Sequence, residues 1–216
     1  MKQFAVIGLG RFGSSVARTL AQMGHEVLAI DTSEERVDAI SQEVTRAVQL
    51  DAMDEDSLQA VGIRNFDTVV VAIGENIQAS ILVALILKEL GVKHVVVKAS
   101  NELHGKVLEK IGVDKVIYPE RDMGTRLARY LGSKHLVDYL DLSPDYSIVE
   151  VEVDERMAGK TLAQLDLRAR KGLSVVAIRR GANIIMGPGG DDAVQRGDIL
   201  VVIGGKRDLE KLESGR

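Results

Sequence analysis

Residues 4–31 read FAVIGLGRFGSSVARTLAQMGHEVLAID. The apolar run at residues 4–7 is long enough for a buried parallel strand and leads directly into the segment GLGRFG, residues 8–13, which has the pattern G-x-G-x-x-G. Apolar residues then recur at helical spacing, Gly24 ends the expected helix, and residues 26–30 form the next expected strand. This order of strand, glycine turn, helix and strand predicts a Rossmann-like α/β unit.

The three glycines of the turn each have a physical role in such a unit. Gly8 permits the tight turn, Gly10 lets backbone amides approach a pyrophosphate, and Gly13 lets the following helix pack closely on the strand. The amino terminus of that helix offers unpaired N–H groups and the positive end of its dipole to phosphate. The sequence therefore predicts a phosphate site made of backbone, with Arg11 and Phe12 inside the same turn.

An acidic residue, Asp31, closes the second strand. A carboxylate about 20 residues after the glycines is where a Rossmann unit accepts hydrogen bonds from ribose hydroxyls, and its charge repels a 2′-phosphate. We therefore expect a nucleotide other than NADP. Thr32 follows as a candidate ligand residue and helix cap, with Glu35 completing a capping box. The alternative is a Rossmann fold that has lost its ligand.

Further candidates lie where later strands end. Asp51 and Ala52 follow the strand expected at residues 44–50 and either contact an adenine edge or, for Asp51, cap the helix expected at 54–61. We expect the β-branched run at residues 68–73 to be a central strand, whose tip holds Ile73, Gly74 and Asn76. Lys98, at the end of the strand expected at 92–99, either faces phosphate or is simply solvated.

The chain divides into two parts on this pattern. Five or six βα units within residues 1–119 predict a doubly wound parallel sheet. An amphipathic helix is expected from Arg121 to about Tyr139, so that residues 120–143 form a crossover helix and linker. Residues 144–216 are expected to be a small α+β domain, with strands at 148–153, 173–178, 183–186 and 199–203 and a helix at 207–212.

The helix expected at residues 77–90 carries no charge from Asn76 to Leu87. A helix that is apolar on all sides is normally buried. It is therefore expected either to form an oligomer interface or to be covered by the second domain.

Composition argues against several classes of function. Aromatic residues make up 3% of the chain with no Trp, and the net charge is −4, so nucleic acid is not an expected partner. There is no Cys and no run of about 18 apolar residues. With no basic and apolar leader before the first strand, the expected location is the cytoplasm.

Catalytic chemistry is not indicated either. No histidine has a companion at metal-ligand or triad spacing, and the serines after the glycine turn have no evident base partner. These histidines are expected to be surface or packing residues, and the serines phosphate hydrogen-bonders or first-turn residues; the residues concerned are His25, His94, His104, His135, Ser14 and Ser15.

Three segments together resemble a known family: GLGRFGSSVARTLAQMGHEVLAID, VVVAIGENIQAS and VIYPERDMG. They are similar to the RCK family (regulators of conductance of K⁺), of the KtrA/TrkA type. The later segments AGKTL, LDLR and GDIL resemble the small RCK_C module that follows the Rossmann-like RCK_N domain. The resemblance implies a cytosolic ring of homodimers, usually octameric, that gates a membrane-embedded KtrB/TrkH-like potassium transporter subunit at the inner face of the membrane.

In that family ATP and ADP compete for the Rossmann cleft, and NAD(H) binds some relatives. Arg11 stands where the family has an arginine for the terminal phosphates, and a guanidinium in this turn suits a charge-dense triphosphate. Glu120 matches the family's acid for a divalent cation beside the γ-phosphate. The alternative for Glu120 is an acid that favours a helix amino terminus.

Several relatives bind cyclic di-AMP on RCK_C. The candidates for its phosphates are Arg168, Arg170, Arg179 and Arg180, unless these arginines are only solvated charges. Three interpretations remain, in this order: a nucleotide-gated regulatory subunit of a potassium transporter, an NAD(H)-responsive sensor of the same architecture, and a small NAD-dependent enzyme.

Overall fold

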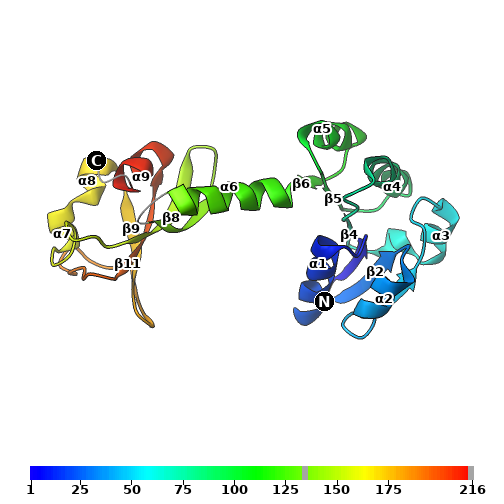
Figure 1. The fold of residues 1–216 in the computed structure, drawn as a ribbon, viewed down its shortest axis with the longest axis horizontal. Coiled ribbons are helices and arrows are strands. Elements are labelled where there is room, and N and C mark those ends of the chain that lie inside the picture. The colour runs from blue at the N-terminus through cyan, green and yellow to red at the C-terminus, as the bar shows by residue number, and fades with distance from the viewer. Residues whose placement is uncertain (133–135, 214–216) are drawn as a thin grey trace. The chain divides into compact units, whose positions relative to one another are not determined.

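A computed structural model describes residues 1–132 and 136–213 of the chain (Figure 1). These residues form two compact units, the first spanning Met1–Pro119 and the second beginning at Glu120. Within the described ranges, no helix combines the length and the apolar character needed to cross a membrane.

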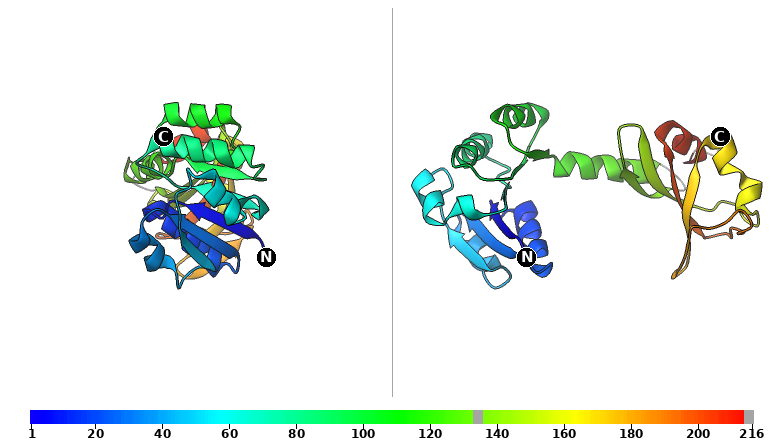
Figure 2. Two further views of the ribbon diagram at one scale, coloured as in Figure 1. Left: turned by 90° about the vertical axis from the view of Figure 1, so that its right-hand side faces the viewer. Right: turned by 180° about the vertical axis from the view of Figure 1, so that it is seen from behind.

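The first unit contains a six-stranded parallel sheet with strand order β3-β2-β1-β4-β5-β6. The prediction of a doubly wound parallel sheet is confirmed. Strands and helices alternate along the chain (Figure 2). The strands are β1 (Gln3–Ile7), β2 (Glu26–Asp31), β3 (Arg46–Gln49), β4 (Thr68–Val71), β5 (Val95–Lys98) and β6 (Lys115–Ile117). The helices are α1 (Arg11–Gln22), α2 (Glu34–Ile40), α3 (Glu55–Ala60), α4 (Ile77–Glu89) and α5 (Glu102–Ile111), with a 3₁₀ turn at Ile63–Asn65.

Both faces of this sheet are covered, which explains why its strands are apolar without alternation. In β1, Ala5 and Ile7 pack in one cluster with residues of α3, α4 and α5, whereas Val6 packs in another with residues of α1 and α2. Successive side chains of a strand point to opposite faces, so β1 contributes to both clusters. The sheet therefore lies between two layers of helices.

The order of the sheet reverses between β1 and β4, which pair side by side with Ile7 opposite Val71. In an open α/β sheet, a ligand binds in the crevice outside the carboxyl ends of the strands at this switch point. Here the switch point, the expected place of such a crevice, is flanked by the glycine turn after β1 and by residues 72–76 after β4.

The second unit contains a five-stranded antiparallel sheet with strand order β10-β9-β11-β8-β7. Its strands are β7 (Leu136–Asp141), β8 (Tyr146–Glu152), β9 (Ser174–Arg180), β10 (Asn183–Met186) and β11 (Ile199–Gly205). Its helices are α6 (Pro119–Gly132), α7 (Leu162–Leu165), α8 (Leu167–Lys171) and α9 (Lys206–Glu213). Alternate residues of β8 and β11, such as Val149, Val151, Leu200 and Val202, form its core.

The helix expected from Arg121 to about Tyr139 is shorter than the sequence indicated. α6 ends at Gly132, and residues 136–141 form the strand β7, which pairs with β8. The helical reading was wrong here because LVDYLD gains its backbone hydrogen bonds from a distant strand, which local periodicity does not reveal. Residues 133–135, including His135, lie outside the described residues.

The expected cap at Thr32 was also wrong. Ser33 is the N-cap of α2, and its side chain accepts a hydrogen bond from the Arg36 amide. The cap lies one residue later because the Ser33 amide donates to the Asp31 carboxylate, which turns the chain before the helix begins. A capping box from Thr32 to Glu35 is therefore not formed.

The apolar helix α4 buries one side and exposes the other within its own unit. Val83, Ala84 and Leu87 are fully buried, whereas Leu82 and Leu85 are 47% and 39% exposed. The prediction that this outer side is an oligomer interface therefore concerns two large apolar side chains.

Candidate functional site

Two of the three glycines in the turn are required by packing. Gly8 has a φ of +93°, and its N–H donates to the Ile30 carbonyl at 2.8 Å. A Cβ at Gly8 would lie 3.0 Å from the carbonyl carbon of Ala72, and a Cβ at Gly13 would lie 1.8 Å from the Gly8 oxygen. These approaches hold α1 and the loop after β4 tightly against the turn.

Gly10, in contrast, faces open space. A Cβ there would have no heavy atom within 4 Å. Gly10 is the N-cap of α1, and the first hydrogen bond of the helix runs from the Ser14 amide to its carbonyl at 2.9 Å. The N–H groups of Arg11, Phe12 and Gly13 therefore have no partner within the helix, as expected of a first turn.

The surroundings of this helix end favour an anion. The first turn of α1 contains no acidic residue and no side chain caps it. The Arg11 side chain is exposed and Phe12 is half-buried. The hydroxyl of Ser14 donates to the Leu9 carbonyl at 2.8 Å, so Ser14 is a first-turn residue, one of its two expected roles.

Asp31 is buried, at 7% exposure, and both of its oxygens face the protein. Oδ2 accepts the Leu9 N–H at 2.6 Å, and Oδ1 accepts the Ser33 N–H at 2.9 Å. The Arg36 guanidinium lies 3.6 Å from Oδ2. Each carboxylate oxygen has a further lone pair, so Asp31 can hold the glycine turn in place and still accept from a ribose hydroxyl.

The residues after β3 lie close to Asp31. The Leu50 amide donates to the Asp31 carbonyl at 3.0 Å, and the carbonyl of Thr32, an exposed residue, accepts from the Gln49 side chain at 3.0 Å. Ala52 is buried.

Asp51, which is exposed, does not cap α3. Its Oδ1 accepts from the Met53 amide at 2.9 Å, and the N-cap position of that helix belongs to Asp54. The alternative that Asp51 caps the helix was therefore wrong, because the chain makes a further turn before the helix starts.

Phe12, Gly74 and Lys98 lie close together on the other side of the switch point. The Lys98 Nζ lies 5.9 Å from the centroid of the Phe12 ring, within the range of a cation–π contact. A Cβ at Gly74 would lie 3.3 Å from the same Nζ. Lys98 is half-buried, so it is held against the two loops and is not simply a solvated lysine.

The remaining candidates of this loop contribute to the fold, through a helix cap, core packing and a backbone hydrogen bond. The Asn76 side chain accepts from the Ala79 amide at 3.0 Å and caps α4. Ile73 is half-buried and packs against the larger core cluster. The Gly74 carbonyl accepts a hydrogen bond from the Ser100 hydroxyl at 2.8 Å. No sequence motif pointed to Ser100.

Glu120 lies in the first turn of α6 and is exposed. Among the residues that the structure describes, no group of three or more His, Cys, Asp or Glu side chains is arranged to hold a metal ion. Glu120 by itself therefore supplies one carboxylate and not a complete cation site.

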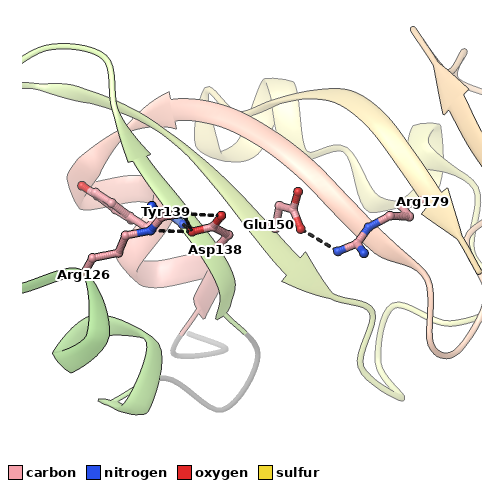
Figure 3. A network of polar contacts seen from close by, with 5 residues as sticks. All are labelled: Arg126, Asp138, Tyr139, Glu150 and Arg179. Atoms are coloured by element: carbon pink, nitrogen blue, oxygen red, sulfur yellow. Dashed lines mark hydrogen bonds and ion pairs between the residues drawn. The ribbon is translucent and has the colours of Figure 1, made fainter. Parts of the chain in front are cut away.

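Two of the four arginines proposed for cyclic di-AMP are engaged in ion pairs. Arg179 contacts Glu150 at 2.6 Å, a pair drawn in Figure 3 beside the contacts of Arg126 with Asp138. Arg180 makes a two-pronged contact with Asp198, at 2.9 and 2.8 Å. This contact holds the pKa of the buried Asp198 carboxyl below its ordinary value. Arg168 is exposed, and the side chain of Arg170 lies outside the described residues.

Comparison with known families identifies both parts of the chain. Residues 4–119 match the TrkA-N domain, and residues 146–214 match the TrkA-C domain. Among solved structures, the chain is similar in fold to the GsuK channel bound to NAD, with a TM-score of 0.68 and 19% identity over 98% of this chain and 39% of that one.

Three curated relatives are similar over nearly their whole length. The chain is 50% identical to the Ktr system potassium uptake protein C of Bacillus subtilis, over 98% of this chain and 96% of that protein. It is 47% identical to the Ktr system potassium uptake protein A of the same organism, over 99% and 96%, and 41% identical to that of Vibrio alginolyticus, over 99% and 97%. The resemblance to the KtrA/TrkA type is confirmed, and the chain belongs to the family of Ktr and Trk potassium uptake proteins with a TrkA-N and a TrkA-C domain.

Proposed function

We propose that the chain is the nucleotide-sensing regulatory subunit of a potassium uptake system, and that ATP and ADP compete for the crevice at the switch point of the first unit. The observation that carries this proposal is the open amino terminus of α1 at Gly10, which lies beside the buried Asp31 carboxylate. Close relatives are named as potassium uptake proteins, which supports the choice of system.

Different residues of the first unit bind the phosphates, the ribose and the adenine in this proposal. The N–H groups at the start of α1 receive the phosphates. Asp31 accepts hydrogen bonds from the ribose hydroxyls. Asp51 and Ala52 follow β3, and there they contact the edge of the adenine. Lys98, held between Phe12 and Gly74, adds a positive charge on the far side of the crevice.

Discrimination between ATP and ADP falls to Arg11. Its side chain is exposed at the first position of α1, so it can reach beyond the phosphates that the backbone binds. A guanidinium donates two parallel hydrogen bonds to a terminal phosphate. Glu120 contributes a carboxylate to a divalent cation that accompanies ATP, with phosphate oxygens as the other ligands.

The regulated partner in this proposal is a membrane-embedded KtrB/TrkH-like potassium transporter subunit on whose cytoplasmic side the chain assembles. Homodimers, in an octameric ring, form through the outer side of α4, where Leu82 and Leu85 are exposed. A ligand shifts such an assembly only if it binds one state more tightly than the other, and the Arg11 contact with the γ-phosphate provides that difference. The role requires no catalysed reaction.

The second unit, in this proposal, is the RCK_C module, and its candidate ligand is cyclic di-AMP. Arg168 is exposed, whereas Arg179 and Arg180 already pair with Glu150 and Asp198. A phosphate contact through either paired arginine would compete with its carboxylate, so Arg168 is the stronger candidate.

A second candidate function, an NAD(H)-binding sensor, is favoured by Asp31. A carboxylate at this position, behind a backbone-made phosphate site, suits the ribose of NAD as well as that of ATP. The two functions differ in whether binding depends on a terminal phosphate, which ATP has and NAD lacks.

A thermal-shift titration of the full chain with ATP, ADP, AMP, NAD and NADH, with and without magnesium, tests the proposal. A ligand that binds only the folded state stabilises it by about 2.7 kcal/mol at 100 times its dissociation constant. We expect shifts with ATP and ADP, and an effect of magnesium on ATP alone. A shift with NAD(H) alone would contradict the ATP/ADP proposal.

Arg11→Ala tests the discrimination directly. We expect ATP affinity to fall by about tenfold or more, to the level of ADP, because a charge-assisted hydrogen bond contributes about 1.5–3 kcal/mol. The matched control is Arg18→Ala, which removes the same charge from the same helix at a residue that pairs with Glu43. Isothermal titration calorimetry gives both affinities, and an equal loss of ATP and ADP in Arg11→Ala would refute the assigned role.

A further inference from the structure

A short chain of hydrogen bonds connects the crevice loop to a buried histidine. The Ser100 hydroxyl donates to the Gly74 carbonyl at 2.8 Å, and the Ser100 amide donates to His104 Nδ1 at 3.3 Å. Gly74 belongs to the loop after β4, and Ser100 follows β5, so the chain of bonds joins the ends of two neighbouring strands to the first turn of α5.

His104 is an unfavourable choice for packing alone. The residue is 2% exposed, and its Nε2 is buried without a hydrogen-bond partner. Burying a polar atom without a partner destabilises the fold, and an apolar side chain of similar size would avoid that loss. The feature that an apolar side chain would not reproduce is the acceptor at Nδ1.

The same contact defines the protonation state of the ring. Because Nδ1 accepts the Ser100 N–H, the neutral imidazole carries its proton on Nε2. Burial lowers the pKa of His104 below its ordinary value, since a charged imidazolium is poorly solvated there. The ring is thus kept neutral, with Nδ1 free of a proton and able to accept the Ser100 N–H.

We propose that His104 is a positioning residue for the nucleotide loop: its Nδ1 fixes Ser100, and the Ser100 hydroxyl in turn fixes the Gly74 carbonyl at the edge of the crevice. This inference rests on the proposed function, since it concerns the same crevice. A Cβ at Gly74 would lie 3.3 Å from Lys98 Nζ, which itself lies 5.9 Å from the Phe12 ring centroid, so a shift of this loop would change the space that the lysine occupies beside the glycine turn.

A purely local role for His104 makes a different prediction. The His104 amide donates to the Asn101 side chain at 2.9 Å, and Asn101 is the N-cap of α5. The His104 ring bonds the Ser100 amide, one residue before the N-cap, so it too contacts the backbone at the start of α5. If His104 served only this cap, its loss would lower stability and leave nucleotide affinity unchanged.

The experiment measures the affinities of ATP and ADP by isothermal titration calorimetry on the full chain, together with the melting temperature of each variant. His104→Leu removes the acceptor at similar size, Ser100→Ala removes the hydroxyl, and His104→Asn places Oδ1 where Nδ1 was. Asn101→Ala is the matched control, because it removes the cap and leaves the Ser100 contacts in place.

We expect His104→Leu and Ser100→Ala each to weaken binding of both nucleotides by about tenfold, the equivalent of one hydrogen bond. His104→Asn should restore most of the affinity. The double variant with Leu at 104 and Ala at 100 should lose no more than either single variant, because both act through one chain of bonds. Asn101→Ala should melt at a lower temperature and bind normally.

Two results would overturn the inference alone: wild-type affinity in folded His104→Leu, or a loss in Asn101→Ala equal to the loss in His104→Leu. If His104→Leu does not fold, Ser100→Ala carries the test, because Ser100 is exposed and its loss leaves no cavity. Failure of the wild-type chain to bind ATP and ADP would instead overturn the proposed function.

Discussion

Replacing Gly13 by alanine would place a methyl group where α1 touches the glycine turn. The new Cβ would lie 1.8 Å from the Gly8 oxygen and 3.1 Å from the Cβ of Ala72. The nearest atom belongs to the backbone, so no side-chain rotation relieves the clash. Either α1 or the turn after β1 must move.

Gly10→Ala is the matched variant three residues earlier. Its new methyl would meet no heavy atom within 4 Å, and the φ of −66° suits alanine. The methyl would, however, occupy the open side of the turn, where the proposed phosphate contacts the backbone.

The two substitutions differ in expected magnitude. Overpacking typically destabilises a fold by about 1–3 kcal/mol, and a backbone clash belongs at the upper end of that range or above it. For Gly10→Ala, the lower entropy of the unfolded chain stabilises by about 0.4–1 kcal/mol. The weaker helix cap offsets this by a similar amount, so its stability should stay within about 1 kcal/mol of wild type.

Differential scanning calorimetry of the full chain measures both effects. The chain has two units, so two transitions are expected, and the one that ATP raises belongs to the unit that binds it. Gly13→Ala should lower that transition by on the order of 10 °C. Gly10→Ala should leave it in place without nucleotide and abolish most of the rise with ATP.

Either of two outcomes would refute the reasoning. If Gly10→Ala destabilises the unit as much as Gly13→Ala, the turn is not open at Gly10. If Gly10→Ala binds ATP as tightly as the wild type, the phosphates do not lie at this turn.

Further predictions concern both units. Asp31→Asn replaces one carboxylate oxygen by an NH2 group, so one of the two backbone N–H groups loses its acceptor. Calorimetry should show a loss of about 1–3 kcal/mol in the free energy of unfolding and an equal fall in the affinities of ATP and ADP. The lowered pKa of Asp198 stabilises the second unit fully above the ordinary value of 3.8, and that stability is lost as the pH falls below it. Arg180→Met should reduce this acid dependence, as followed by circular dichroism at stepped pH. Replacing Leu82 and Leu85 by Glu should lower the oligomeric state in sedimentation without unfolding the chain, because both side chains are exposed.

The first unit could be predicted well from the sequence because its signals are local. The apolar strands, the glycine turn and the acid at the end of β2 each have a fixed spacing, and the repeated βα units indicate a parallel sheet. The caps were less predictable. Whether Thr32 or Ser33 begins α2 depends on where the Asp31 carboxylate points, which only the packed glycine turn decides.

Contacts between distant residues account for most of what the sequence did not reveal. Strand β7 forms because β8 lies beside it, and Arg180 is engaged because Asp198 lies on a neighbouring strand end. His104 was expected to be a surface or packing histidine, and its burial agrees with the packing role. Its bond to Ser100 depends on the geometry of α5 and carried no sequence signal beyond the spacing of four residues.

The groups that face the open end of the glycine turn are main-chain N–H groups, and such groups have no proton to gain or lose between acid and neutral pH. The anion affinity of the turn itself should therefore be the same at any pH at which the chain stays folded. If nucleotide binding varies with pH, the variation must come from ionisation of the nucleotide or of side chains around it. A pH titration of ATP affinity thus separates the backbone's part in recognition from that of the side chains without any mutation.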